Sequence, residues 1–303
     1  MNGIYFPGLG IFLENVPRGI HIGSFFLPFY AIVVTSGFVL AYFVSLKEAK
    51  RTGQNEEDYL DFFLAMVIPS IIGARIYYII FYPDRFIEEG KSFGKTLLDM
   101  INIRNGGLAI YGGLIAGTIT GLIFSRVKKI SLPLLGDTVT MGVLIGQILG
   151  RWGNFFNREA FGTFTSSVFR MAIPVEYYSN TFYNEMVSTG IITSEMQEHT
   201  EMVKGITCIT VHPTFLYEGL WNLLILAIIF FYRKKKKFDG ELAMIYVAGY
   251  GVGRFLVESL RSDSLMLGPL KISQVVAVAC VLVAVGVIIY NRMLLKKKDT
   301  ETI

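Results

Sequence analysis

Charged residues are scarce in this sequence. Only 17% of its 303 residues are Asp, Glu, Lys or Arg, and 52% are hydrophobic, whereas soluble proteins carry about 25% charged residues. The mean hydropathy is +0.51. This composition excludes an ordinary soluble domain and is typical of a membrane protein. The net charge of +4 does not indicate a nucleic-acid partner, because the lysines cluster between apolar segments and so predict membrane topology.

Several catalytic patterns are also missing. The two cysteines, Cys208 and Cys280, have no ligand or redox spacing and are expected to pack as small hydrophobic side chains. The sequence has no zinc motif of the HExxH type, no Walker loop and no serine–histidine pair at useful spacing. These absences exclude the common ways in which a chain supplies its own metal or nucleophile. We therefore expect no metal site and no cofactor.

Long apolar stretches dominate what is present. A helix needs about 20 residues to cross the hydrocarbon core, and seven stretches are long enough. They predict an all-α polytopic membrane protein with seven transmembrane helices, at residues 24–46, 59–81, 106–125, 133–152, 213–232, 240–259 and 271–291. The fourth has the weakest hydropathy, because it contains Asp137, Gln147 and four glycines.

The basic residues predict the orientation of these helices. If the loop after the first span is cytoplasmic, more than half of the 28 Lys and Arg residues lie in the short cytoplasmic segments, as the positive-inside rule requires. The N-terminus is then outside and the C-terminus cytoplasmic. Residues 1–303 form a single integral membrane domain in this interpretation, with 155–212 as an extracytoplasmic insertion, a small head between spans four and five. We therefore expect a multi-pass membrane protein.

Glycine recurs every fourth residue in two of the spans. The third contains Gly113, Gly117 and Gly121, and the fourth contains Gly142, Gly146 and Gly150. Such a stripe lets helix backbones approach closely in lipid, so we expect these two helices to be neighbours at the centre of the bundle.

Polar side chains gather at one depth, near the predicted outer ends of six spans. A charge at the centre of a membrane helix costs roughly 2.5–3.5 kcal/mol on insertion scales, so such residues usually face a cavity or a partner. In the sixth span, Tyr250, Arg254, Glu258 and Arg261 follow at intervals of 4, 4 and 3 and share one helical face. The other residues at this depth are Tyr30, Arg75, Tyr111, Arg151, Asn154 and His212.

A purely structural interpretation of these residues stays open. Arg254 and Glu258 could form an ion pair one turn apart, and Glu159 could simply neutralise Arg151. Arginines near span ends can also reach lipid phosphates with no other role. The convergence of all these groups at one depth favours a functional site. Because guanidinium groups bind phosphate bidentately, the pattern indicates an enzyme that stabilises charge on a lipid phosphate while another molecule attacks.

The stretch "GRWGNFFNREAFG", Gly150–Gly162, resembles the signature of the bacterial prolipoprotein diacylglyceryl transferase family, which reads roughly G-R-x-G-N-F-x-N-x-E-x-x-G. All of its fixed positions match. The stretches "GARIYYIIFY", "NGGLAIYGG", "HPTFLYE" and "GYGVGRFLVESLR" are similar to the other blocks of the family, in the same order. The resemblance extends over nearly the whole chain, and the predicted topology agrees with that of the family. It implies a multi-pass protein of a bacterial cytoplasmic membrane whose active site faces the outer leaflet.

The resemblance implies a function. Members transfer the diacylglyceryl group of phosphatidylglycerol to the thiol of the lipobox cysteine in the signal peptide of a preprolipoprotein. They form a thioether and release glycerol-1-phosphate. The expected partners are thus phosphatidylglycerol, the lipobox peptide and the bilayer. Arg151 and Arg254 match the family's essential arginines. The other functional positions that match are Tyr30, Asn154, Glu159, Gly162 and Tyr250.

Further residues complete the expected site. Gly112 lies where the backbone could approach a ligand. Glu258 is expected to orient Arg254, and Glu159 to orient Arg151. Arg75, His212 and Arg261 are expected to have supporting roles, because they lie at the same depth.

One position departs from the family pattern. Where the family commonly has H-G-G, this chain has "YGG" at Tyr111. The histidine has been proposed as the base that activates the thiol, whereas a tyrosine with a pKa of about 10 is a poor base at neutral pH. We expect Tyr111 to donate a hydrogen bond to the phosphate or the thiolate. The alternative function is a phospholipid-binding or transport protein without catalysis, since arginines within membranes also mark transport pathways.

Overall fold

The computed structural model describes residues 2–87, 90–103 and 106–301. The chain divides into two compact units, Met1–Ala41 with Thr140–Ile303, and Tyr42–Val139. We call them the sheet unit and the α2–α4 unit after their contents. Helices α1, Phe29–Arg51, and α5, Leu132–Asn157, contribute residues to both units.

Helices account for most of the described residues. Besides α1 and α5 there are eight, which are α2 (Glu56–Phe81), α3 (Phe93–Ile101), α4 (Ile110–Val127), α6 (Asn180–Ser188), α7 (Ser194–Glu198), α8 (Thr214–Tyr232), α9 (Glu241–Ser259) and α10 (Ile272–Glu301). Each of the seven predicted spans coincides with one of these helices, and their ends agree within five residues, except that α10 continues ten residues beyond the predicted end at 291. Apolar runs of this length form helices, because a helix satisfies the hydrogen bonds of its own backbone N–H and C=O groups where water is absent.

Six of these helices are long and apolar enough to cross a membrane, namely α1, α2, α4, α5, α10, and α8 with the turn that follows it. The expected span at residues 240–259 is also a helix, α9, but it contains Arg254 and Glu258 and is not among the six. The structure therefore shows a mostly helical membrane protein with six candidate spans among the described residues. Seven spans and their orientation stay a prediction.

Among the described residues, nine short strands accompany the helices, and all of the pairings between them are antiparallel. The main sheet has the strand order β2-β1-β5-β7-β6. Its strands are β1 (Ile4–Phe6), β2 (Ile11–Leu13), β5 (Met171–Pro174), β6 (Glu201–Val203) and β7 (Ile206–Val211). Two hairpins are formed by β3 (Gly19–Ile22) with β4 (Phe25–Pro28), and by β8 (Met266–Leu267) with β9 (Leu270–Lys271).

The main sheet combines distant parts of the sequence. Tyr5 of β1 pairs with Ala172 of β5, and Ile173 pairs with Ile209 of β7. The folded head therefore contains the N-terminal strands as well as the predicted insertion at 155–212. Its core includes Ile4, Ile173 and Ile209, which are fully buried.

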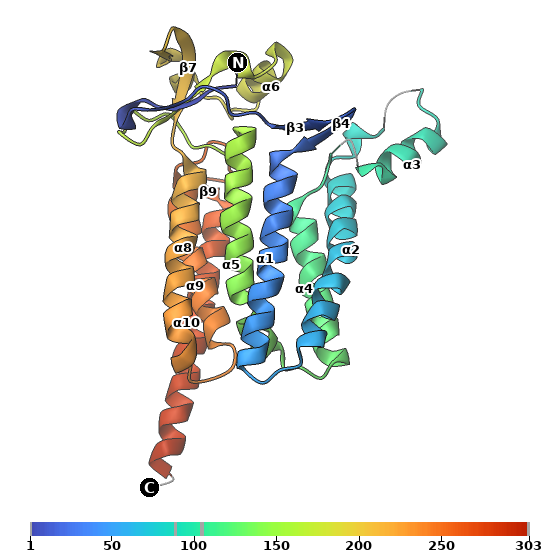
Figure 1. Cartoon of the computed structure of the whole chain (residues 1–303), viewed down its shortest axis with the longest axis vertical. Coiled ribbons are helices and arrows are strands. Elements are labelled where there is room, and N and C mark those ends of the chain that lie inside the picture. Colours follow the sequence, from blue (N-terminus) through green and yellow to red (C-terminus); the bar gives the residue numbers. More distant parts are fainter. Residues whose placement is uncertain (1, 88–89, 104–105, 302–303) are drawn as a thin grey trace. The chain divides into compact units, whose positions relative to one another are not determined.

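Within the sheet unit, the sheet lies at the end where α8 begins (Figure 1). Strand β7 ends three residues before α8, while α5 ends at Asn157 and α9 ends at Ser259 beside the same region, where Gly162 bridges Arg261. Helix α9 packs against both α8 and α10. The Trp221 indole fits over Gly253, and its N–H donates to the Gly249 carbonyl at 2.8 Å.

Aromatic side chains fix the ends of α5 and α8 against each other. The rings of Phe155 and Phe215 lie 5.0 Å apart, and those of Trp152 and Phe215 lie 5.4 Å apart. Such pairs stabilise by about 0.5–1.5 kcal/mol beyond their buried area. This contact lies next to a polar pair of the same two helices, Arg151, one residue before Trp152, and Glu218, three residues after Phe215.

In the α2–α4 unit, the glycine stripe of α4 packs against α2. An added Cβ at Gly117 would meet Met66 and Ser70, and one at Gly121 would meet Phe62. The predicted role of the stripe in close helix packing is confirmed for this pair. The predicted proximity of α4 and α5 concerns two different units and stays a prediction. Gly146 of α5 is approached by Gly37 of α1.

Candidate active site

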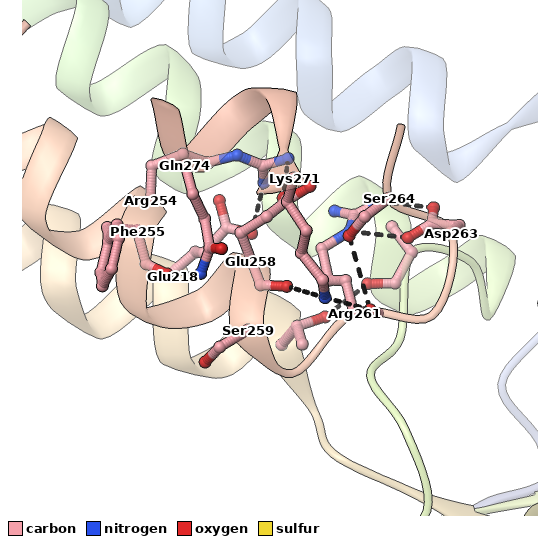
Figure 2. Close-up of polar contacts among 12 residues, drawn as sticks. Glu218, Arg254, Phe255, Glu258, Ser259, Arg261, Asp263, Ser264, Lys271 and Gln274 are labelled. Atoms are coloured by element: carbon pink, nitrogen blue, oxygen red, sulfur yellow. Dashed lines mark hydrogen bonds and ion pairs between the residues drawn. The ribbon is translucent and has the colours of Figure 1, made fainter. Parts of the chain in front are cut away.

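Two arginines and two glutamates from three helices form one ion-pair cluster in the sheet unit. Arg151 of α5 contacts Glu218 of α8 at 2.5 Å between Nη2 and Oε2. Arg254 of α9 contacts the other oxygen of Glu218 at 3.4 Å and Glu258 at 2.5 Å. Figure 2 shows Arg254 with Glu218 and Glu258 beside it. Glu218 thus connects the two arginines, which the sequence placed at the same depth.

The glutamates of this cluster are more deeply buried than the arginines. The side chains of Glu218 and Glu258 are 4% and 2% exposed, while those of Arg151 and Arg254 are 21% and 19% exposed. The carboxylates are therefore enclosed and each arginine keeps an accessible edge. A guanidinium has five N–H donors in a rigid fork, so both arginines can bind an anion while the glutamates hold them in place.

The helical spacing explains the second pair. Arg254 and Glu258 are one turn apart on α9, as the interval in the sequence predicted. Arg261 lies beyond the end of this helix and makes a two-point contact with Asp263, with distances of 2.8 and 2.6 Å. Burial alone would raise the pKa of Asp263, but the hydrogen bonds and charge of Arg261 hold it below its usual value.

Lys271 closes the end of α9. Its Nζ donates to the carbonyls of Glu258 and Arg261 at 2.6 and 2.8 Å (Figure 2). Such a cation at a helix C-terminus satisfies carbonyls that lack a partner in the helix and interacts favourably with the dipole. Lys271 therefore fixes the last turn, which carries Glu258.

The signature sequence forms the end of α5 and the turn that follows it. Arg158 and Ala160 have left-handed backbone conformations with φ of 51° and 55°, which are uncommon for residues other than glycine. The Arg158 guanidinium is buried and donates to the carbonyls of Phe156, Asn2 and Val16. Arg158, which sequence reasoning did not single out, thus ties the turn to the N-terminal segment.

Glu159 lies beside this turn and does not pair with Arg151 in the structure. Its carboxylate accepts a hydrogen bond from Asn157 at 3.1 Å. Burial raises the pKa of Glu159, while the bond from Asn157 and the charge of Arg18 act in the opposite direction. The expected orientation of Arg151 by Glu159 is replaced by the contact with Glu218.

Tyr30 and Gly162 are in close contact with the same segment. The Tyr30 ring packs on Gly153, where an added Cβ would lie 2.7 Å from Cδ2. The Gly162 amide donates to the His212 carbonyl at 3.0 Å. A Cβ at Gly162 would lie 2.8 Å from both His212 Cβ and the Leu260 carbonyl oxygen. Gly162 therefore lets the turn, the start of α8 and the end of α9 meet.

His212 and Tyr250 lie on the elements that carry the cluster, His212 just before α8 and Tyr250 on α9. The His212 Nδ1 lies 3.4 Å from the Tyr217 hydroxyl, and burial lowers the pKa of the imidazole, which favours its neutral form. Tyr250 stacks on Tyr246, with ring centroids 5.8 Å apart, one turn before Arg254.

A cavity of about 590 Å³ lies in the sheet unit, around the turn that follows α5, and none of the four residues of the ion-pair cluster lines it. Asn154 and Glu159 contribute polar groups to its wall, Asp263 connects it to the Arg261 pair, and Phe182 and Met186 make part of it apolar. The cavity can therefore hold a ligand with both polar and apolar parts.

Arg75, Tyr111 and Gly112 belong to the α2–α4 unit. The Arg75 guanidinium is buried and donates to five carbonyls at 2.6–2.9 Å, those of Asp99, Met100, Asn102, Gly106 and Gly107. These bonds use all five of its N–H groups. Arg75 therefore holds the segment before α4 and has no donor left for a ligand.

Tyr111 and Gly112 follow that segment in the first turn of α4. Tyr111 is 46% exposed, and its ring lies 6.2 Å from that of Tyr77. A Cβ at Gly112 would lie 2.1 Å from the Gly73 carbonyl oxygen, so this glycine permits the crossing of α2 and α4.

Glu218 is the residue of the cluster that sequence reasoning missed. It stands in the block "HPTFLYE" within an apolar helix. An acidic residue in a candidate span needs a partner, and that signal could have identified it. Among the described residues, no group of three or more His, Cys, Asp or Glu side chains is arranged to hold a metal ion.

The chain is similar to known proteins over most of its length. The family model described as "Prolipoprotein diacylglyceryl transferase" matches residues 17–290. A phosphatidylglycerol–prolipoprotein diacylglyceryl transferase of Listeria welshimeri is 37% identical over 277 residues, which cover 91% of this chain and 90% of the relative. A protein of the same name from Streptococcus agalactiae is 39% identical over 278 residues, 91% of this chain and 96% of the relative. The match to the family model and these identities show that the chain belongs to the prolipoprotein diacylglyceryl transferase family.

Proposed function

We propose that this protein transfers the diacylglyceryl group of phosphatidylglycerol to the lipobox cysteine of a preprolipoprotein, with Arg151 and Arg254 holding the lipid phosphate. The names of the relatives give both substrates. The observation that carries the assignment of residues is the ion-pair cluster, in which two buried glutamates hold two arginines that each keep an accessible edge.

The cluster suits a phosphate in the outer leaflet. We propose seven spans, with α9 as the sixth in order, the N-terminus outside and the C-terminus cytoplasmic. In the sheet unit the cluster lies toward the sheet, whereas the basic stretch Arg233–Lys237 connects the other ends of α8 and α9. The positive-inside rule assigns that basic stretch to the cytoplasm, which assigns the sheet and the cluster to the outside.

The reaction increases the negative charge where the arginines lie. The substrate thiol first loses its proton to water, and a thiol with a pKa of about 8.5 is already a few per cent thiolate at neutral pH. The sulfur then bonds to the glycerol carbon attached to the phosphate oxygen. The carbon–oxygen bond breaks and its electron pair stays on that oxygen. The products are a thioether and glycerol-1-phosphate.

The arginines stabilise this step because charge develops on the phosphate they contact. The phosphate changes from a diester with one negative charge to a monoester that carries more. A preorganised donor aimed at a developing charge is typically worth 10²–10³ in rate. Glu218 and Glu258 fix both guanidiniums before the lipid arrives, so little reorganisation is needed during the reaction.

The cavity around the turn that follows α5 supports a site for the peptide. It lies beside Asn154 and Asp263 and combines polar with apolar walls. A lipobox peptide carries backbone amides as well as apolar side chains. We therefore propose that the peptide binds in this cavity and presents its cysteine toward Arg151.

Purified protein tests this function directly. The protein in detergent is given phosphatidylglycerol and a lipobox peptide, and both glycerol phosphate and the lipidated peptide are measured. We expect equal amounts of the two products. Lipid binding without either product would instead favour the phospholipid-binding or transport alternative.

A further inference from the structure

A second polar layer lies one helical turn deeper than the ion-pair cluster. Gln147 precedes Arg151 by four residues on α5, and Asn222 follows Glu218 by four on α8. The two helices run in opposite directions at the Arg151–Glu218 contact, so both steps lead away from the sheet by about 6 Å. Tyr246 of α9 joins this layer by accepting a hydrogen bond from Gln147 at 2.8 Å.

Asn222 is the unusual member of the layer. Its side chain lies in an apolar helix and the residue is only 2% exposed, yet its Nδ2 has no hydrogen-bond partner among the described residues. Leaving a buried amide group unpaired typically costs about 1–3 kcal/mol. A buried donor of this kind needs an acceptor that the described protein groups do not supply.

The space beside Asn222 is open. Gly219 is buried, and it lies three residues from Asn222 on the same face of α8. An added Cβ at Gly219 would nevertheless meet no atom within 4 Å. On α5, Gly150 lies three residues from Gln147, and a Cβ there would also meet nothing within 4 Å. Gly219 and Gly150 are each one residue deeper than Glu218 and Arg151, so the two glycines leave room between the depth of the ion-pair cluster and that of the second layer.

Gln147 can supply a second donor to this space. Its Nε2 donates to the Tyr246 hydroxyl, and its Oε1 is buried without a hydrogen-bond partner among the described residues. The amide can rotate by half a turn and keep its bond to Tyr246, because a phenol donates as well as accepts. The layer then presents two amide donors, one from Gln147 and one from Asn222.

We infer that this layer binds the two ester carbonyls of the diacylglyceryl group, with Asn222 Nδ2 as the first donor and the Gln147 amide as the second. The inference rests on the proposed binding of phosphate by Arg151 and Arg254. In a phospholipid the ester carbonyls lie deeper than the phosphate, separated from it by the glycerol carbons, and they accept hydrogen bonds but cannot donate. Gripping the lipid on both sides of its glycerol would fix the carbon that the thiolate attacks.

Lipids with and without ester carbonyls test this inference. Diacyl phosphatidylglycerol has both carbonyls, whereas the dialkyl ether analogue keeps the phosphate, the headgroup and the chains but lacks them. We expect the wild-type enzyme to show a higher kcat/KM for the diacyl lipid. The Asn222→Leu variant should lose about three- to tenfold in kcat/KM for the diacyl lipid, as for one hydrogen bond, and should change little for the dialkyl lipid.

The ratio of the two kcat/KM values does not depend on how much of a variant is folded, so a poorly folding variant still gives an answer. Gln147→Leu should also bring the ratio of kcat/KM for the diacyl lipid to kcat/KM for the dialkyl lipid closer to one. Ser45→Ala is the matched control, since it removes another buried polar group without a hydrogen-bond partner, in the α2–α4 unit, and should leave the ratio unchanged.

Two outcomes overturn the inference. In one, the wild-type enzyme does not distinguish the lipids. In the other, Asn222→Leu lowers kcat/KM equally for both, as loss of a buried water site or of helix packing would. Failure of the proposed phosphate site is a separate result, because it would appear as near-normal turnover of both lipids by Arg151→Lys.

Discussion

Glu218 holds both arginines, whereas Glu258 contacts only Arg254. We expect Glu218→Gln to lower the rate of glycerol phosphate release by about 10², because small displacements of a catalytic group can cost that much. Glu258→Gln should lower it by about tenfold or less, and by less than Arg254→Ala does. Thermal unfolding of both variants in detergent is the control for folding. Equal losses in the two variants would show that Glu218 has no special role, and a Glu258→Gln enzyme as inactive as Arg254→Ala would argue for proton transfer by Glu258.

Tyr111 stands where the family commonly has histidine. A phenol hydroxyl can donate one hydrogen bond, as an imidazole N–H can, so we expect this residue to donate a hydrogen bond. Tyr111→Phe should lower the rate by about two- to tenfold, which is the range of one neutral hydrogen bond. If Tyr111→His instead raised the rate strongly and added a new limb near pH 6–7 to the pH–rate profile, position 111 would be the base.

Arg75 is expected to act on stability. All five N–H groups of its guanidinium are bonded to carbonyls, and a lysine has only three donors. Arg75→Lys should therefore reduce the free energy of unfolding by about 2–4 kcal/mol, since bonds to charged groups contribute about 1.5–3 kcal/mol each. The midpoint of thermal unfolding measures this. A variant of normal stability that has lost turnover would indicate a ligand role.

At the scale of single residues, the sequence predicted part of the site. The interval of four between Arg254 and Glu258 was enough to predict their ion pair, because both lie on one helix. The partner of Arg151 could not be found in the same way. It comes from another helix, and the nearest carboxylate in the sequence, Glu159, lies beyond a turn that directs it to Asn157.

At the scale of elements, the crossing of α2 and α4 depends on glycines that face each other, Gly73 and Gly112. A Cβ at Gly112 would lie 2.1 Å from the Gly73 carbonyl oxygen, which is backbone and cannot move aside, whereas one at Gly113 would come no closer than 3.4 Å to any neighbour. We expect Gly112→Ala to destabilise the protein by about 1–3 kcal/mol, as overpacking does. Gly113→Ala, the matched control, should be near neutral, and thermal unfolding compares them. An equal loss of stability in the two variants would argue against a special role of Gly112 where α2 crosses α4.

The helices were predictable because an apolar run long enough to span lipid must satisfy its own backbone hydrogen bonds, and a helix does so. The strands were not. They are two to six residues long, and the main sheet pairs β1 with β5, more than 160 residues later. Pairing between such distant segments leaves no periodic signal in either one, so the folded structure of 155–212 could not be derived from its residues.

At the scale of the molecule, charge is confined to defined places. The basic residues Arg233–Lys237 and the buried carboxylates Glu218 and Glu258 lie toward opposite ends of α8 and α9. The distribution of charge along α8 and α9 thus predicts the membrane topology from one end of the helices and the position of the active site from the other. The central claim is that the two arginines at the second end form a fork on phosphate, and a lysine cannot reproduce a fork.

The most direct test is the rate of glycerol phosphate release from phosphatidylglycerol by Arg151→Lys and Arg254→Lys, in the presence of a lipobox peptide. Each variant keeps the positive charge and should remain folded, which thermal unfolding in detergent checks. We expect each to lose at least about 10² in rate, because the bidentate contact with the developing charge is gone. Near-normal turnover by either folded variant would contradict the account for that arginine.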